Sequence, residues 1–299
     1  MKIGLIGLGN MGTHFARRWL DAGYDLSVND ANTILVREFV ARGAHASTSA
    51  KAMATEVDAV FLSLPTPDVV STVATGTDGL IEGSKIEVVV DLSTTGPTVS
   101  RFVAAKLAEE DISFIGAPVS GGTLAAEKGS LAIMASGSAE YLKKLESVFS
   151  IIGNHHFYLG EDPGNGQTMK IINNTLCAVN NVAAMEALVY GAKSGLDSET
   201  MLNVLNVSSG RSFATLEKIP QCILDRSFPM RFTTELIHKD VGLCLEEAEK
   251  AGATMPMGTA AEQLLAFVIS QGDGRKDYAH VIKHFEKLSG AVFGSPSDS

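Results

Sequence analysis

Lys170 and Asn174 are the side chains whose types and spacing best suit proton transfer beside a bound polar group. They stand four residues apart in a stretch that reads as one long helix, Met169 to Lys193, so they share a face, and Asn181 falls close to the same direction. The residues that flank this polar line are apolar, so an otherwise buried helix must turn the line towards something polar. A lysine that is partly desolvated there, beside a cationic ring, has its pKa lowered towards neutrality, where it can accept and donate protons. A lysine that reaches solvent from the start of a helix would show the same spacing.

Three glycines near the start of the chain predict a dinucleotide-binding loop. Gly7, Gly9 and Gly12 have G-x-G-x-x-G spacing, follow an apolar run that reads as a strand and precede a helix pattern, with Asn10 and Met11 completing the loop. The first glycine allows the tight turn, the second lets the backbone approach a pyrophosphate, and the third packs the helix on the sheet. The free N–H groups of the helix N-terminus attract the phosphates. A glycine-rich turn without a ligand is the alternative.

Asp30 indicates which dinucleotide this loop takes. It ends the second apolar segment, 18 positions after Gly12, where a carboxylate accepts hydrogen bonds from the adenosine ribose and repels a 2′-phosphate. NAD is therefore favoured as the cofactor. NADP remains open because Asn29 and Arg37 stand nearby and either side chain could accommodate a phosphate.

Further polar loops directly follow predicted strands. They are Leu64 and Pro65 at the end of strand 59–64, Ser93 and Thr94 after strand 88–92, and Ser120, Gly121 and Gly122 after strand 112–115. Open α/β sheets bind ligands beyond the carboxyl ends of their strands, so these loops are placed to meet a cofactor or substrate. A serine followed by two glycines can also present several N–H groups to a carboxylate. Each loop could instead be a plain turn.

The secondary structure expected to position these residues changes along the chain, from strands alternating with helices to helices alone. Short apolar runs at 2–6, 26–29, 59–64, 88–92, 112–115 and 131–136 alternate with helix patterns and predict parallel strands covered on both faces. Beyond the break at 160–166, helices are expected at 169–193, 197–207, 213–224, 233–251, 256–270 and 277–288, with no convincing strand. The expected fold is a Rossmann-type doubly wound α/β domain over 1–163, followed by an all-α substrate and oligomerisation domain over 164–299, which opens with a long interdomain helix from about residue 166.

Composition narrows the class of protein. The chain has 299 residues, 45% of them hydrophobic, and a net charge of −10, which argues against nucleic acid or an anionic membrane as a partner. Its three widely spaced cysteines form no C-x-x-C pair, which favours free thiols in a cytoplasmic protein. The sequence has no run of 18 apolar residues, so no membrane-spanning helix is expected. No His or Cys residues have zinc-ligand spacing, so a metal-independent mechanism is favoured. The sequence also has neither a G-x-S-x-G motif nor a P-loop, which argues against hydrolase and kinase chemistry.

Taken together, these segments resemble the β-hydroxyacid dehydrogenase family over essentially the whole chain. The motifs that carry the resemblance are GLGNMG at 7–12, DLST at 91–94, APVSGG at 117–122, GNGQTMKIINN at 164–174 and HKD at 238–240. The resemblance implies that Lys170 is the catalytic lysine. It also implies that the substrate carboxylate and hydroxyl are held by Ser120, Gly121, Gly122 and Asn174, and that Thr94 and Lys239 reach the cofactor.

Some positions depart from the usual family pattern. Gly116 stands where many relatives have Asp, and the segment 124–128 lacks a common glycine, which leaves the shape of the substrate pocket open. The block 208–212, SSGRS, resembles relatives that act on hydroxyisobutyrate-like or dicarboxylic substrates. Arg211 is therefore a candidate partner for a second anionic group of the substrate. A structural ion pair at a helix end is the alternative for this arginine.

The expected activity is reversible NAD-linked oxidation of a short β-hydroxy acid to its semialdehyde, with Lys170 as general acid and base. The alternatives within the family are reduction of tartronate semialdehyde and oxidation of 2-(hydroxymethyl)glutarate. Imine reductases usually lack this lysine, and a decarboxylating 6-phosphogluconate dehydrogenase would be longer and would need a phosphate-binding cluster. A non-enzymatic nucleotide sensor on the same fold is the alternative from another class. A homo-oligomer, dimer or tetramer, is expected.

Overall fold

The computed structural model describes residues 1–295. The chain divides into two compact units, Met1–Lys170 and Ile171–Ser299, the second described through Ser295. Helix α9 (Asn165–Lys193) begins in the first unit and continues through the second. The boundary expected after residue 163 remains a prediction, as do the roles expected for the two parts.

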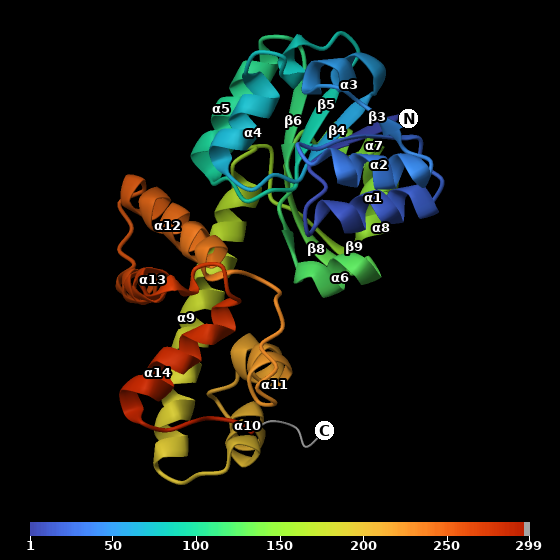
Figure 1. Ribbon diagram of the computed structural model, residues 1–299. Helices are drawn as coiled ribbons and strands as arrows, with labels where there is room; N and C mark the ends of the chain where they lie inside the picture. The colour runs from blue at the N-terminus through green and yellow to red at the C-terminus, as the bar shows by residue number, and fades with distance from the viewer. Residues whose placement is uncertain (296–299) are drawn as a thin grey trace. The chain divides into compact units, whose positions relative to one another are not determined.

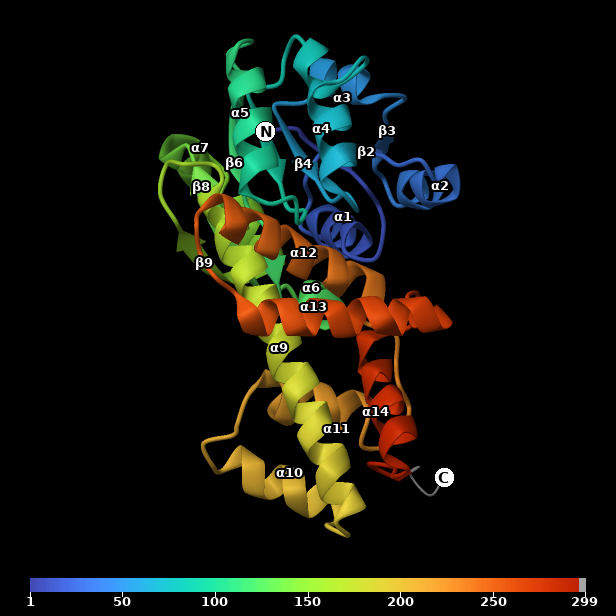
Figure 2. The same cartoon turned by 90° about the vertical axis from the view of Figure 1, so that its left-hand side faces the viewer.

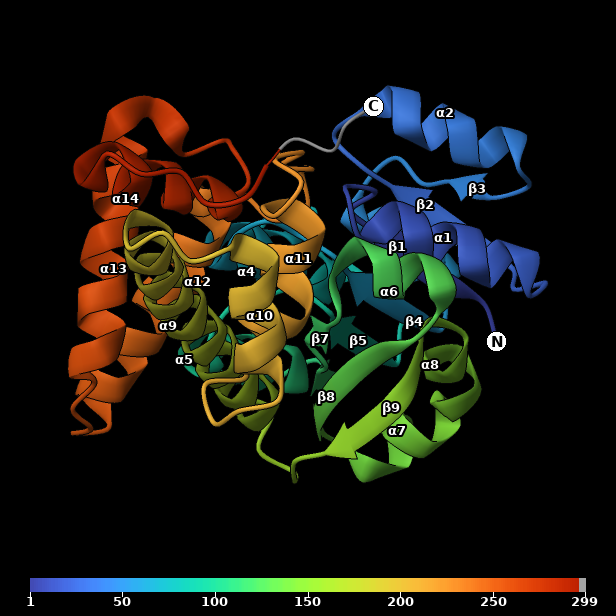
Figure 3. The ribbon, with the colours of Figure 1, turned by 90° about the horizontal axis from the view of Figure 1, so that it is seen from below.

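A mostly parallel sheet forms the centre of the first unit (Figure 1). Its strands are β1 (Ile3–Ile6), β2 (Leu26–Asn29), β3 (His45–Ala46), β4 (Ala59–Leu62), β5 (Val88–Asp91), β6 (Ser113–Gly116), β7 (Val119–Ser120), β8 (Leu131–Gly137) and β9 (Gly153–Tyr158). Strands β3-β2-β1-β4-β5-β6 run parallel in that order, and β8 joins β6 in the opposite direction. At that side β8 also pairs with β7 and, as Figure 3 shows, with β9. The carboxyl ends of β1, β2, β4, β5 and β6 therefore share one edge, which we call the carboxyl edge.

Helices cover both faces of this sheet, as a doubly wound fold requires. They are α1 (Gly12–Asp21), α2 (Thr33–Ala41), α3 (Ala50–Glu56), α4 (Pro67–Thr75), α5 (Pro97–Ala108), α6 (Gly122–Lys128), α7 (Ala139–Lys144) and α8 (Glu146–Ile152). One apolar core joins the sheet to α1, α2, α6 and α8, with Trp19 fully buried in it, and a second core joins the other face to α3, α4 and α5. Burial on both faces explains why β1, β4 and β5 are apolar without alternation.

Three short or polar strands lie outside the sequence prediction. Strands β3 and β7 have only two residues each, which is too short for a periodic pattern. Strand β9 contains His155 and His156, and its residues after Gly153 are exposed. It is held by its pairing with β8, so backbone hydrogen bonding rather than apolar content makes it a strand.

The second unit is helical. After α9 its helices are α10 (Ser198–Asn206), α11 (Ile219–Cys222), α12 (Thr234–Lys250), α13 (Pro256–Val268) and α14 (Val281–Ser289). Figure 2 shows α12 and α13 side by side. Where the sequence predicts one helix over 213–224, a π-helical turn, Ala214–Lys218, leads into α11. Pro220 is the reason within the chain, because it has no N–H to close the regular helical hydrogen bond. The only β pairing described after α9 is an isolated bridge between Thr233 and Asp277.

The predicted fold class, a Rossmann-type sheet followed by helices, is confirmed. Within residues 1–295, no helix has the length and apolar character needed to span a membrane.

An ion pair between Arg101 and Asp162 joins helix α5 to the segment before α9 and predicts that the stability of the protein depends on pH. Arg101 on α5 donates to both carboxylate oxygens of Asp162, at 2.9 and 3.0 Å, and the N–H of Gly164 donates to the same carboxylate at 2.8 Å. The hydrogen bond from Arg101 is the largest cause that lowers the pKa of Asp162 below its ordinary value, and burial opposes it. A carboxyl whose folded pKa is lowered stabilises the fold above its unfolded pKa, ~3.9, and loses that contribution as the pH falls through the folded value.

Replacing Asp162 with Asn should therefore destabilise the protein near neutral pH and have less effect in acid. The expected loss is at most ~1 kcal/mol, because both side chains are about half exposed and solvent screens the pair. Urea unfolding of the native chain and of D162N at about pH 6 and about pH 3 measures the difference. An equal difference at both values would contradict the titration of Asp162 as its source.

Candidate active site

The three glycines of the first loop are required for different reasons. Gly7 has φ +100°, and a Cβ there would lie 2.2 Å from the carbonyl oxygen of Ser63. A Cβ on Gly12 would lie 1.9 Å from the carbonyl oxygen of Gly7. Gly9 has an ordinary φ, and a Cβ there would meet no described atom within 4 Å. The chain itself therefore demands glycine at two positions, while the open space at Gly9 fits the close approach of a pyrophosphate.

This difference predicts separable effects of alanine substitution. Gly9→Ala should leave the melting temperature nearly unchanged and raise the Kd for NAD at least about tenfold, because its methyl group occupies the space that the pyrophosphate needs. Gly12→Ala should instead fail to fold or melt far lower, since its methyl group meets a backbone carbonyl. Thermal unfolding and calorimetric NAD titration of both variants check this. An unchanged NAD affinity in Gly9→Ala would remove the role assigned to that glycine.

Asp30 is joined directly to the glycine loop. One carboxylate oxygen accepts a hydrogen bond from the N–H of Leu8 at 2.6 Å, and the other accepts from the N–H of Asn32 at 2.6 Å. The carboxylate is thus held at the end of β2 in a half-exposed position beside the loop. The Asn29 side chain donates to the carbonyl of Ser47 and is committed within the chain. Arg37 is exposed on α2.

The loops after β4 and β5 meet at the carboxyl edge. The N–H of Leu64 donates to the Ser93 hydroxyl at 2.8 Å, which joins the Leu64–Pro65 turn to the loop that carries Thr94. Thr94 is half-buried, whereas both of its neighbours are buried. It is therefore the side chain of this loop that is placed to meet a ligand.

The serine–glycine loop after β6 starts at the same edge, since the N–H of Ala117 donates to the carbonyl of Asp91, the last residue of β5. Gly121 and Gly122 have φ values of +130° and +67°. Successive residues in such conformations turn their N–H groups to one side and can form an anion-binding concavity. A Cβ on Gly122 would meet no described atom, so the loop is open at that residue.

The start of α9 carries the proposed proton-transfer residue. The Lys170 side chain is nearly buried, and Asn174 lies one turn further along the same helix. In the second unit, the Asn174 amide donates to the Asp240 carboxylate at 2.6 Å, and the Lys239 ammonium lies 2.9 Å from the other oxygen of Asp240. Asp240 thus holds two predicted site residues, one on α9 and one on α12. Asn181 instead donates to the carbonyl of Cys177 in its own helix.

Two observations differ from what the sequence suggested. Asp240 has no assigned role in the sequence prediction, although it stands within the HKD motif, and a carboxylate beside Lys239 on a partly apolar helix is the signal that could have indicated it. Arg211 is exposed and forms no ion pair with any residue in 1–295, so the structural ion pair considered for it is not observed there.

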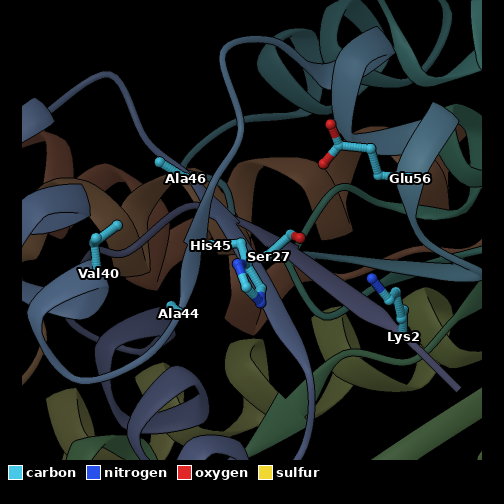
Figure 4. Close-up of a pocket in the computed structure, with 7 residues that line it drawn as sticks. All are labelled: Lys2, Ser27, Val40, Ala44, His45, Ala46 and Glu56. Atoms are coloured by element: carbon cyan, nitrogen blue, oxygen red, sulfur yellow. The ribbon is translucent and has the colours of Figure 1, made fainter.

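A surface pocket of the first unit lies away from these residues. It has a volume of about 500 Å³ and is lined by Lys2, Ser27, Val40, Ala44, His45, Ala46 and Glu56 (Figure 4). Lys2 immediately precedes β1, so this pocket is near the amino ends of the strands, opposite the carboxyl edge. It contains none of the predicted site residues.

Comparison with known proteins gives matches to both parts of the chain. Residues 2–160 match the family described as the NAD binding domain of 6-phosphogluconate dehydrogenase, and residues 164–285 match that described as NAD-binding of NADP-dependent 3-hydroxyisobutyrate dehydrogenase. The chain is 38% identical to 2-(hydroxymethyl)glutarate dehydrogenase of Eubacterium barkeri, over 97% of this chain and 96% of that protein. It is 34% identical to NAD-dependent L-serine dehydrogenase of Pseudomonas aeruginosa, over 97% and 99% respectively.

A solved structure has the same architecture. The crystal structure of 3-hydroxyisobutyrate dehydrogenase from Salmonella typhimurium superimposes with a TM-score of 0.84 at 29% identity, covering 95% of this chain and 99% of that one. The matched ranges extend over both units. They include the glycine loop, the carboxyl edge and the start of α9. We conclude that this chain belongs to the β-hydroxyacid dehydrogenase family and is an NAD(P)-dependent oxidoreductase.

Proposed function

We propose that this enzyme oxidises a short β-hydroxy acid reversibly to its semialdehyde, with Lys170 as the general base of oxidation and the general acid of reduction. The observation that carries the proposal is the nearly buried lysine one helical turn before Asn174, whose amide Asp240 holds in place. Bound NAD would supply the acceptor for the hydride that leaves the alcohol carbon. Lys170 takes the hydroxyl proton as the hydride leaves and returns a proton in the reverse direction.

The other predicted residues bind and orient in this proposal. The N–H groups of the loop at Ser120, Gly121 and Gly122 hold the substrate carboxylate, and Asn174 holds the hydroxyl. Asp240 fixes the Asn174 amide, because its oxygen accepts from that amide and so decides which way the remaining amide atoms point. Thr94 and Lys239 contact the cofactor.

Asp30 supports a preference for NAD over NADP. Its carboxylate is already fixed beside the glycine loop by two backbone N–H groups, so a 2′-phosphate would have to lie against a stationary negative charge. The nearby Asn29 amide does not offset this, because it is bonded to Ser47.

The substrate class is proposed from the site and from the relatives. A 2-(hydroxymethyl)glutarate dehydrogenase, an L-serine dehydrogenase and 3-hydroxyisobutyrate dehydrogenases all match the chain, and their names describe short hydroxy acids. We propose a 3-hydroxyisobutyrate-like substrate, with tartronate semialdehyde and 2-(hydroxymethyl)glutarate as the alternatives. Arg211, exposed and without an ion pair in the described chain, is proposed as the partner of a second substrate carboxylate. An unchanged KM for every acid in Arg211→Ala would contradict that role.

A spectrophotometric panel tests the proposed reaction. Hydroxyisobutyrate, glycerate, serine, threonate and 2-(hydroxymethyl)glutarate are each offered with NAD and with NADP, and Lys170→Ala serves as the blank. We expect reduction of NAD with at least one acid and weaker reduction of NADP. Tight NAD binding without turnover of any of these acids would instead favour the nucleotide-sensing alternative.

Assembly and location are also proposed. Helix α9 exposes apolar side chains three, four and seven residues apart, including Ile172 and Leu176, and exposes Tyr190 further along. Such a stripe on a helix supports a homo-oligomer formed through the helical part, as expected for a substrate and oligomerisation domain. Light scattering would measure its mass. Cytoplasmic location is supported by Cys222 and Cys244, which are both buried free thiols.

A further inference from the structure

Gln167 is a fully buried amide in the first turn of α9, three residues before Lys170. Its carbonyl oxygen accepts a hydrogen bond from the N–H of Thr95 at 3.0 Å and a longer one from the N–H of Gly96 at 3.4 Å. Its NH₂ group donates to the carbonyl of Ser93 at 2.8 Å. The orientation of the amide is settled by these partners, because reversing it would set NH₂ against backbone N–H groups and oxygen against oxygen.

These bonds enclose one residue. The Ser93 carbonyl and the Thr95 N–H are the backbone groups on either side of Thr94, so the Gln167 amide pairs with this loop as a neighbouring strand would pair with it. Thr94 itself is left half-buried, whereas the two residues beside it are buried. Gln167 therefore determines where the accessible side chain of the loop stands.

A buried carboxylate completes the attachment. Asp91 accepts from the N–H of Ser93 at 2.9 Å and from the Thr95 hydroxyl at 3.0 Å, and the NH₂ group of Gln167 lies 3.4 Å from the same carboxylate. Asp91 and Gln167 are both fully buried. The loop is thus bonded on one side to the end of β5 and on the other to α9. In such a network a lost partner leaves a buried polar group unsatisfied, so alternative placements are disfavoured.

We propose that Gln167 is a positioning residue that holds Thr94 and Lys170 in one fixed relation, through its amide on the Thr94 loop and its backbone in the helix turn of Lys170. The inference rests on the proposed function of those two residues. A hydride and a proton transferred in one step require the cofactor contact and the base to keep their places together, and a displacement of about 1 Å can cost about a hundredfold in rate.

Two variants of Gln167 test the hydrogen-bond donor and the hydrogen-bond acceptor of its side-chain amide. Gln167→Met has nearly the same size and removes all the hydrogen bonds of the side chain. We expect it to lower kcat at least about tenfold and to speed hydrogen exchange at the Thr95 and Gly96 amides. Gln167→Glu keeps an acceptor for those amides, but as a carboxylate it repels Asp91 and the Ser93 carbonyl. When protonated it again has a donor and an acceptor, so its kcat relative to the native chain should recover as the pH falls.

Thr168→Ala is the matched control, since the Thr168 hydroxyl donates to the Gly164 carbonyl within the same helix start. It should match the native chain in kcat, pH profile and exchange at Thr95 and Gly96. A folded Gln167→Met with native kcat and native exchange would overturn the inference, and so would a Gln167→Glu whose relative kcat does not change with pH. If the native chain turns over none of the acids, the proposed function has failed, whereas exchange at Thr95 and Gly96 still tests the attachment made by Gln167.

Discussion

Replacing Lys170 with alanine is expected to lower kcat by about 10² to 10⁴, while the Kd for NAD stays within about twofold of the native value. The amine of Lys170 is the proposed acceptor of the proton that leaves the substrate hydroxyl, and alanine cannot accept it. The glycine loop and Asp30, which are proposed to bind the cofactor, lie at the ends of β1 and β2 and are untouched by the substitution. Binding and turnover should therefore separate. Steady-state assays should show the loss of kcat, and calorimetric titration should show native NAD binding.

The control for this variant is Lys193→Ala. Lys193 is the other lysine of α9 and is exposed at the far end of the same helix, so its loss removes a lysine without touching the proposed proton carrier. It should keep native kcat. Partial recovery of Lys170→Ala by added small primary amines would confirm that a proton carrier is what was lost. Near-native turnover in Lys170→Ala would refute the assignment.

Replacing Asp277 with alanine is expected to cost about 3 to 5 kcal/mol of unfolding free energy. Asp277 is fully buried and accepts four hydrogen bonds, from the Lys218 ammonium at 2.6 Å and from the N–H groups of Ala279, Arg231 and Phe232 at 2.8 to 2.9 Å. Its removal leaves the buried Lys218 charge without its carboxylate, although the ammonium still lies over the Tyr278 ring, 4.2 Å from the ring centre. This one carboxylate joins three segments of the second unit, so its loss should be felt through the whole helical core.

Urea unfolding measures this loss, with Lys276→Ala as the matched control. Lys276 is the neighbouring residue, and its ion pair with Asp273 is about half exposed on the lysine side, so its loss should cost at most ~1 kcal/mol. Lys218→Met should fall between the two, because Asp277 then keeps its three backbone donors. Equal unfolding midpoints for Asp277→Ala and Lys276→Ala would contradict the importance of the buried pair.

Sequence reasoning succeeded where a pattern is local. The apolar runs of β1 and β4, and of β5 as far as Val90, identify parallel strands because both faces of the sheet are covered. It did not predict β9, because an exposed strand that contains two histidines has no apolar pattern and is held by its pairing with β8. Likewise, nothing in the helix pattern over 213–224 distinguishes a π-helical turn from a regular one, even though Pro220 disfavours regular bonding there.

The candidate site divides along the same line. By itself the sequence determined the glycine loop with Asp30 at the next strand end, and the one-turn spacing of Lys170 and Asn174, because each depends on the geometry of a short stretch of backbone. Only the tertiary structure decided that Asp240 holds Asn174, 66 residues away, and that Gln167 holds the loop around Thr94, more than 70 residues away. A hydrogen bond between such distant residues exists because whole elements pack at one distance and orientation, and that packing is the sum of many weak contacts which no local spacing records.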